Sequence, residues 1–144
     1  MLLPVTLTIA AACAVINLWL ALRLVGGRLK GISVGDGGDP VMLAGMRAHA
    51  NFTEYAPFVL ILIAGIELAG GSPTWLWIAG AAFVVARIAH PLGMMRPVPN
   101  PFRAGGILVT WAALALLAGW AAILAYQGTH RPLAETVPVE APRG

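Results

Sequence analysis

A run of polar side chains opens one of the apolar segments of this chain, where polar groups are costly. Four of its residues stand at positions i, i+4, i+7 and i+8: Arg47, Asn51, Glu54 and Tyr55. On a helix these positions share one face, which then carries a cation, an amide, a carboxylate and a phenol. Polar groups inside membrane segments usually face the bundle interior and serve a function. A zwitterionic ligand would suit this face, since Arg47 can bind a carboxylate and Glu54 an ammonium group.

Two further polar groups are expected at the same end of the molecule. Arg87, His90 and Met94 stand at i, i+3 and i+7 and share a face of another predicted helix. Arg103 lies at the start of the last predicted helix, where a cation is unfavourable unless it has an anionic partner. Together with the free N–H groups of a helix start, Arg103 would bind an anion and favour the thiolate form of a nearby thiol.

Each polar residue also has a plain structural interpretation. Asn51 could act only as an interhelical hydrogen-bond donor, and His90 could be a satisfied residue of the bundle. Glu67 is most simply an interfacial carboxylate. Arginines at membrane edges commonly extend to the headgroups and set topology, an interpretation that fits Arg23, Arg28 and Arg96. The functional interpretation is favoured because costly groups on three predicted helices converge at one membrane depth.

Composition identifies the class of protein that must position these groups. The chain has 144 residues, of which 59% are hydrophobic and 10% charged, and its mean hydropathy is +0.83. Soluble domains carry about 25% charged residues, so we expect one compact membrane bundle. A net charge of +3 does not indicate nucleic-acid binding, and the single cysteine, Cys13, excludes an intrachain disulfide. No metal site is expected, because the histidines lack ligand spacing.

Four segments are apolar and reach the length of about 20 residues that a spanning helix needs. We expect helices at about residues 3–25, 40–69, 74–94 and 102–126, followed by a proline-rich flexible tail at residues 127–144. Asp39 and Pro40 are typical of a helix start, and the glycines before Pro73 indicate a tight turn. The predicted fold class is therefore an all-α integral membrane protein with a bundle of four transmembrane helices.

Basic residues flank the loops before the second and fourth predicted helices, whereas the turn at residues 70–73 has none. The positive-inside rule therefore places these two loops, and the polar face with them, in the cytoplasm and both termini outside. A reporter inserted at residues 70–72 should lie on the outer side of the membrane. A cytoplasmic reporter at that turn would reverse the predicted orientation.

The polar segment at residues 47–57 resembles the signature of a known family. Its sequence, Arg-Ala-His-Ala-Asn-Phe-Thr-Glu-Tyr-Ala-Pro, is similar to that of the MAPEG family, the membrane-associated proteins in eicosanoid and glutathione metabolism. The likeness extends to Arg87 and His90, to Arg103 and to the four-helix layout. The segment at residues 35–40 resembles the bacterial branch of the family.

The resemblance implies a homotrimer in a bacterial inner membrane, with glutathione as co-substrate bound between subunits near the cytoplasmic side. Arg103 matches the family arginine that stabilises the glutathione thiolate, so it is the implied catalytic residue. The residues that match glutathione contacts are Arg28, Arg47, Asn51, Glu54, Tyr55 and His90. Arg23 is the alternative to Arg28. Met94 and Ala104 stand where relatives carry hydroxyl groups.

The implied activity is that of a glutathione-dependent transferase or peroxidase acting on lipophilic electrophiles or lipid hydroperoxides. Its partners would be copies of itself, membrane lipids, glutathione and a second substrate that arrives from the bilayer. One alternative is a small four-helix transporter for lipophilic cations, which needs a membrane-embedded carboxylate as its ion site. The cation Arg47 beside Glu54 argues against it. The other alternative is a membrane protein that binds glutathione without catalysis.

Overall fold

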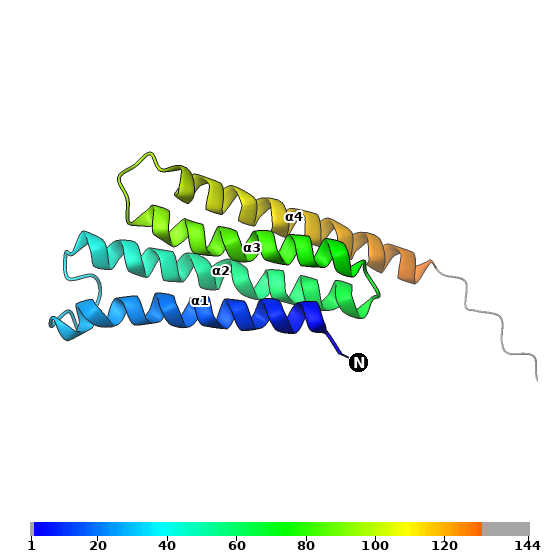
Figure 1. Cartoon of the computed structure of the whole chain (residues 1–144), viewed down its shortest axis with the longest axis horizontal. Coiled ribbons are helices and arrows are strands. Elements are labelled where there is room, and N and C mark those ends of the chain that lie inside the picture. Colours follow the sequence, from blue (N-terminus) through cyan, green and yellow to red (C-terminus); the bar gives the residue numbers. More distant parts are fainter. Residues whose placement is uncertain (1, 131–144) are drawn as a thin grey trace, which may run out of the picture.

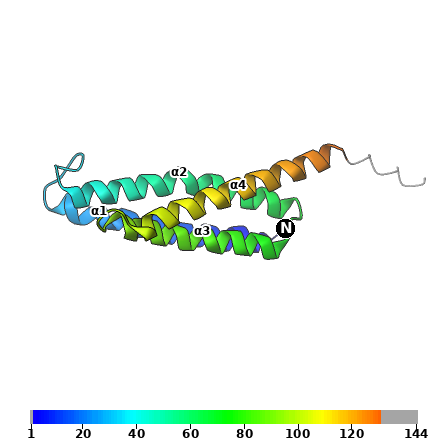
Figure 2. The ribbon, with the colours of Figure 1, turned by 90° about the horizontal axis from the view of Figure 1, so that it is seen from above.

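Four long helices form the bundle in a computed structural model that describes residues 2–130 (Figure 1). They are α1 (Pro4–Leu29), α2 (Pro40–Leu68), α3 (Pro73–Met94) and α4 (Pro101–Thr129). The helices run side by side in alternating directions, so that both long loops lie at one end (Figures 1 and 2). All 4 are long and apolar enough to cross a membrane. The predicted fold class, an all-α membrane bundle of four helices, is confirmed.

Every helix begins with a proline at its first position, where the missing N–H group costs no hydrogen bond. Polar side chains just before two of these prolines accept from the free N–H groups that follow. The Asp39 carboxylate accepts from the Val41 N–H at 2.8 Å, and the Asn100 side chain accepts from the Phe102 N–H at 3.0 Å. The predicted start of the second helix at Asp39 and Pro40 is therefore confirmed.

Two helices run further than the sequence predicted. The first was expected to end near residue 25, but α1 continues to Leu29 and ends before Gly31, whose φ is +94°. A glycine inside a helix costs only about 1 kcal/mol, and packing between α1 and α2 offsets that cost. The last helix reaches Thr129 because Thr129 and His130 both donate to the Tyr126 carbonyl at 2.8 Å. The predicted tail is therefore wrong at residues 127–129, and residues 131–144 lie outside the described part.

The helix α2 lies with α3 at the centre of the bundle. The outer helices α1 and α4 each pack on both of them, and within the described helices α1 and α4 do not meet. One apolar side chain per turn of α1 enters the core: Val5, Ile9, Cys13, Ile16 and Leu20. A site between α2 and α4 is therefore out of reach of α1 of the same chain.

A glycine turn connects α2 to α3. Gly70 has a φ of +77°, a conformation that favours glycine, and its N–H donates to the Glu67 carbonyl at 3.1 Å. The Gly71 N–H donates to the Ile66 carbonyl at 2.9 Å, so that the pair forms a Schellman ending. This ending satisfies the last carbonyls of α2 and makes α3 its antiparallel neighbour, which confirms the predicted tight turn.

Glu67 joins the end of α2 to the start of α1. Its carboxylate accepts from the Val5 N–H at 3.0 Å, the Thr6 N–H at 2.8 Å and the Thr6 hydroxyl at 2.6 Å. The first turn of a helix leaves such N–H groups without intrahelical partners, and Leu3 provides no side-chain cap of its own. The negative charge also faces the positive end of the helix dipole. The interfacial carboxylate thus serves as the cap of α1.

Removal of this cap should destabilise the bundle. We expect Glu67→Ala to lower the free energy of unfolding by about 1–2 kcal/mol, the usual cost of a lost helix cap, and Glu67→Gln to lower it by less. Thermal unfolding of the purified protein in detergent measures both changes. Thr53→Ala is the matched control, because Thr53 is an exposed polar residue on the same helix and its hydroxyl bonds only carbonyls of that helix. Equal unfolding midpoints for the wild type and Glu67→Ala would refute the capping role.

Candidate functional site

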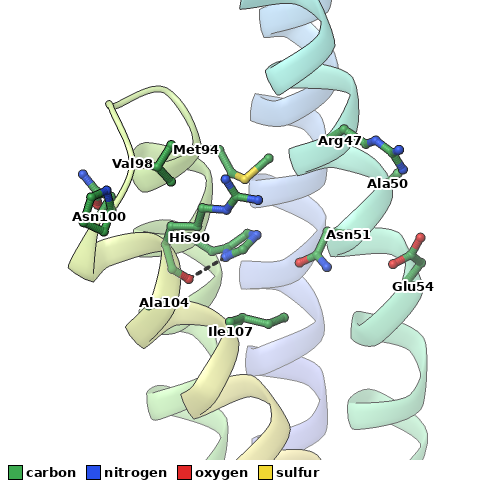
Figure 3. Close-up of a pocket in the computed structure, with 12 residues that line it drawn as sticks. Arg47, Ala50, Asn51, Glu54, His90, Met94, Val98, Asn100, Ala104 and Ile107 are labelled. Atoms are coloured by element: carbon green, nitrogen blue, oxygen red, sulfur yellow. Dashed lines mark hydrogen bonds between the residues drawn. The ribbon is translucent and has the colours of Figure 1, made fainter.

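Polar residues of α2, α3 and α4 meet at a cavity of about 630 Å³ near the loop end of the bundle (Figure 3). Its volume lies within the range of about 300–1,000 Å³ that is typical of small-molecule sites. Met94 and Ala104, which stand where relatives carry hydroxyls, also line this space. The predicted site residues that line the cavity are Arg47, Asn51, Glu54, His90 and Arg103.

The side chains of α2 divide between the inside of the cavity and its edge. Asn51 and His90 point toward one another across the cavity, whereas Arg47 and Glu54 point toward the outer side of α2 (Figure 3). Arg47 and Glu54 are also exposed in the single chain, and they form no ion pair with each other. A ligand that contacts all four side chains would extend from the cavity to its open edge.

Two glycines bring α3 and α4 close enough to form this site. A Cβ atom on Gly93 would lie 2.8 Å from the Cα of Arg103, and one on Gly106 would lie 2.8 Å from the Cβ of His90. Real Cβ atoms do not approach other atoms so closely, so the crossing depends on the absence of a side chain. The crossing places Arg103, in the first turn of α4, beside His90 on α3.

His90 is held in one orientation by the backbone of α4. The side chain is buried, and its Nδ1 lies 3.0 Å from the Arg103 carbonyl oxygen. A carbonyl oxygen can only accept, so Nδ1 carries the proton. When the ring is neutral, Nε2 is therefore an acceptor for a ligand in the cavity.

Arg87 lies directly behind the cavity wall. Its side chain is 1% exposed, and Nη1 donates to the Asn51 side-chain oxygen at 2.8 Å while Nη2 donates to the Gly106 carbonyl at 3.3 Å. The guanidinium carbon is 5.9 Å from the centre of the Tyr55 ring, within cation–π range. Among residues 2–130, Nε has no hydrogen-bond partner and no carboxylate pairs with this cation.

From the sequence, Arg87 belonged to the polar face of His90, but it received no role of its own in the site. Arg87 interrupts an apolar stretch of α3, and an ionisable residue inside a membrane helix is by itself a reason to suspect function. The structure adds what the sequence could not, namely that this guanidinium holds the carbonyl end of Asn51. The amide nitrogen of Asn51 remains available to the cavity.

Two predicted site residues lie outside the cavity of the single chain. The Tyr55 hydroxyl accepts from Trp111 Nε1 at 3.0 Å. Tyr55 follows Arg47 by eight residues, so its side chain is rotated by about 80° around the helix axis relative to that of Arg47. Tyr55 therefore lies at the edge of the face that begins at Arg47. The Arg28 Nη1 donates to the carbonyls of Ile32 and Gly35, each at 3.0 Å. Because α1 is separated from α4, a contact between Arg28 and this site would require a neighbouring copy.

The comparison with protein families agrees with this geometry. The chain matches the MAPEG family over residues 6–123, a range that contains every residue of the cavity. A search of curated proteins finds no match. The family contains membrane-bound glutathione transferases and peroxidases, together with members that are not enzymes. The match covers most of the chain and all four helices, and the chain therefore belongs to the MAPEG family.

Proposed function

We propose that this protein binds glutathione in the cavity between α2, α3 and α4 and activates its thiol for reaction with a lipophilic substrate. The reaction is transfer of glutathione to an electrophile or reduction of a lipid hydroperoxide. The observation that carries the proposal is the convergence, in one cavity of about 630 Å³, of five residues that match the family's glutathione and thiolate contacts. Those residues are Arg47, Asn51, Glu54, His90 and Arg103.

The charges at the edge of the cavity are complementary to the ends of glutathione, which carries two carboxylates and one ammonium group. Arg47 would bind a carboxylate and Glu54 the ammonium group through charge-assisted hydrogen bonds. Both side chains point toward the outer side of α2 and are exposed in the single chain (Figure 3). The middle of the tripeptide would then lie inside, where Asn51 and the free Nε2 of His90 can bind its peptide groups.

Arg103 is the residue that would stabilise the thiolate. When the S–H bond breaks, the proton passes to solvent and the electron pair stays on sulfur, where a guanidinium lowers its energy. The first turn of α4 adds the positive end of a helix dipole at the same place.

In the transfer reaction the thiolate forms a C–S bond with the electrophilic carbon, which then releases its leaving group as an anion or takes up a proton from solvent. In the peroxidase reaction an S–O bond forms as the O–O bond breaks, and the alkoxide leaves as an alcohol after taking up a proton. A second glutathione then reduces the resulting sulfenic acid to glutathione disulfide and water.

Apolar residues complete the cavity and indicate the nature of the second substrate. Met94, Val98 and Ile107 line it beside Ala104, and these four side chains offer no hydroxyl or charge. They can bind an apolar body by contact but cannot select it by hydrogen bonds. This lining supports a lipophilic substrate that enters from the bilayer.

We also propose that the active form is a homotrimer in a bacterial inner membrane. In the proposed orientation the cavity faces the cytoplasm, and both termini lie on the outer side of the membrane. The open edge of the cavity supports the trimer, because Arg47 and Glu54 would otherwise face lipid at a high cost. A neighbouring copy would cover this edge and could supply Arg28. A monomeric mass in mild detergent would contradict the intersubunit site.

Arg103→Ala should reduce thiolate formation at least about tenfold while glutathione still binds. The measurement is a glutathione titration followed by the ultraviolet absorbance of the thiolate. We expect the wild type to show a thiolate signal near neutral pH. The signal of the variant should be at least about tenfold smaller, because one charge contact is lost. Arg96→Ala is the matched control, because Arg96 stacks over Phe102 at 4.9 Å and does not line the cavity.

The titration also separates the proposal from its alternatives. No glutathione binding to the wild type would refute the central claim. Binding without a thiolate signal in the wild type would identify a glutathione-binding protein without catalysis. An unchanged thiolate signal in Arg103→Ala would move the stabilising role to another residue.

Arg87 should act on glutathione binding through Asn51. We expect Arg87→Met and Asn51→Ala each to weaken binding by about tenfold, or about 1.4 kcal/mol, because each breaks the same hydrogen bond. The double variant should bind about as weakly as either single variant, since residues in one network are not additive. Isothermal titration with glutathione measures the three affinities. Fully additive losses would show that Arg87 does not act through Asn51.

A further inference from the structure

A second polar cavity, of about 200 Å³, lies between α1, α2 and the end of α3. From α2 it is lined by Val41 and Gly45, which stand four residues apart on a helix face different from that of Arg47, Asn51 and Glu54. The two cavities share no lining residue. The second cavity is therefore separate from the proposed glutathione site.

Positive charge predominates around this second cavity. Arg23 of α1 and Lys30, the residue that follows α1, line it. The one carboxylate in the lining, that of Asp39, already accepts from the Val41 N–H at 2.8 Å. The first intrahelical hydrogen bond of α2 is made by the Leu43 N–H, so the Met42 N–H of the same turn remains free for a ligand. Two cations and the positive end of α2 thus face one space.

The shape of the cavity suits a group held between water and lipid. Leu24, Met42 and Met95 give it an apolar side, and a Cβ atom on Gly26 would meet no atom within 4 Å. The Arg23 guanidinium lies 5.2 Å from the centre of the Trp19 ring, one turn closer to the middle of the helix. Tryptophans of membrane helices prefer the depth of the lipid headgroups. Arg23 therefore also lies at about the depth of the headgroups.

We propose that this cavity binds the phosphate of an anionic phospholipid. Arg23 and Lys30 would bind the phosphate oxygens, and Leu24 and Met95 would contact the lipid below its headgroup. Basic pockets between membrane helices are known places for anionic headgroups. The bound lipid would hold the loop ends of α1, α2 and α3 together on the face that lies away from the glutathione cavity.

Lipid titration of the purified full chain in neutral detergent tests this site. Phosphatidylglycerol should raise the thermal unfolding midpoint of the wild type, and phosphatidylcholine should not. The variant Arg23→Gln/Lys30→Gln should bind phosphatidylglycerol at least about tenfold more weakly, because two phosphate contacts are lost. Native mass spectrometry should show a bound phosphatidylglycerol on the wild type that this variant loses.

A steric variant keeps both charges and blocks the space. Gly26→Leu should lose the response to phosphatidylglycerol, because Gly26 lines the cavity. Gly119→Leu is the control and should keep the response, because Gly119 lies outside the cavity. At both positions a Cβ atom would meet no atom within 4 Å. Leucine favours a helix over glycine, so neither variant should unfold the protein. Glutathione binding should stay unchanged in both, which separates this test from that of the proposed function.

The remaining arms identify the source of the anion. Inorganic phosphate is tested in place of the lipid on the wild type and on Gly26→Leu. If it stabilises the wild type as strongly as phosphatidylglycerol does and has no effect on Gly26→Leu, the occupant is a free phosphate and the lipid is overturned. A response to phosphatidylglycerol that persists in both the charge variant and Gly26→Leu would overturn the site itself. An equal response to phosphatidylcholine would also overturn it.

Discussion

A guanidinium buried among membrane helices is the group on which the functional half of this bundle depends. Burial of a cation costs several kcal/mol unless hydrogen bonds and nearby π-systems compensate for it. Arg87 meets this requirement only where α2 supplies the Asn51 oxygen and α4 supplies the Gly106 carbonyl. The same carbonyl accepts from the Thr110 hydroxyl at 2.8 Å. The three helices that enclose the cavity are thus held by one polar network, and Asn51 belongs to both the network and the cavity.

Local rules of sequence predicted much of this molecule. Hydrophobic length predicted the four helices, the cap at Asp39 followed from a pair of adjacent residues, and periodicity placed Arg47, Asn51 and Glu54 together. The sequence placed His90 and Arg103 at the same end of the molecule as separate polar groups. Only the family resemblance joined them to the three residues of α2 in one site, because no spacing rule relates residues on different helices. Periodicity also grouped Tyr55 with the residues of α2, whereas its hydroxyl accepts from Trp111 of α4 in the single chain. Periodicity orders residues around one helix but does not say which neighbour each will meet.

Long-range contacts explain what the sequence left open. Glu67 caps the first turn of α1 at Val5, which lies 62 residues earlier in the chain. No local sequence motif predicts such a pair. Arg28, near the end of α1, donates to carbonyls of the loop that follows. Only the packing order of the helices shows that α1 is separated from α4. The extra turn of α1 depends on its contact with α2, which outweighs the poor helix propensity of two glycines. Each of these is a tertiary effect.

The cap at Glu67 has a consequence for how the chain enters the membrane. Until α2 is in place, the free N–H groups of the first turn of α1 have no protein acceptor of their own. Once α2 lies beside it, the acceptors for Val5 and Thr6 arrive with the last turn of the second helix. The α1–α2 hairpin is therefore the smallest segment in which the start of α1 and the end of α2 are both satisfied. Insertion as a hairpin would set the register of these two helices before α3 and α4 follow.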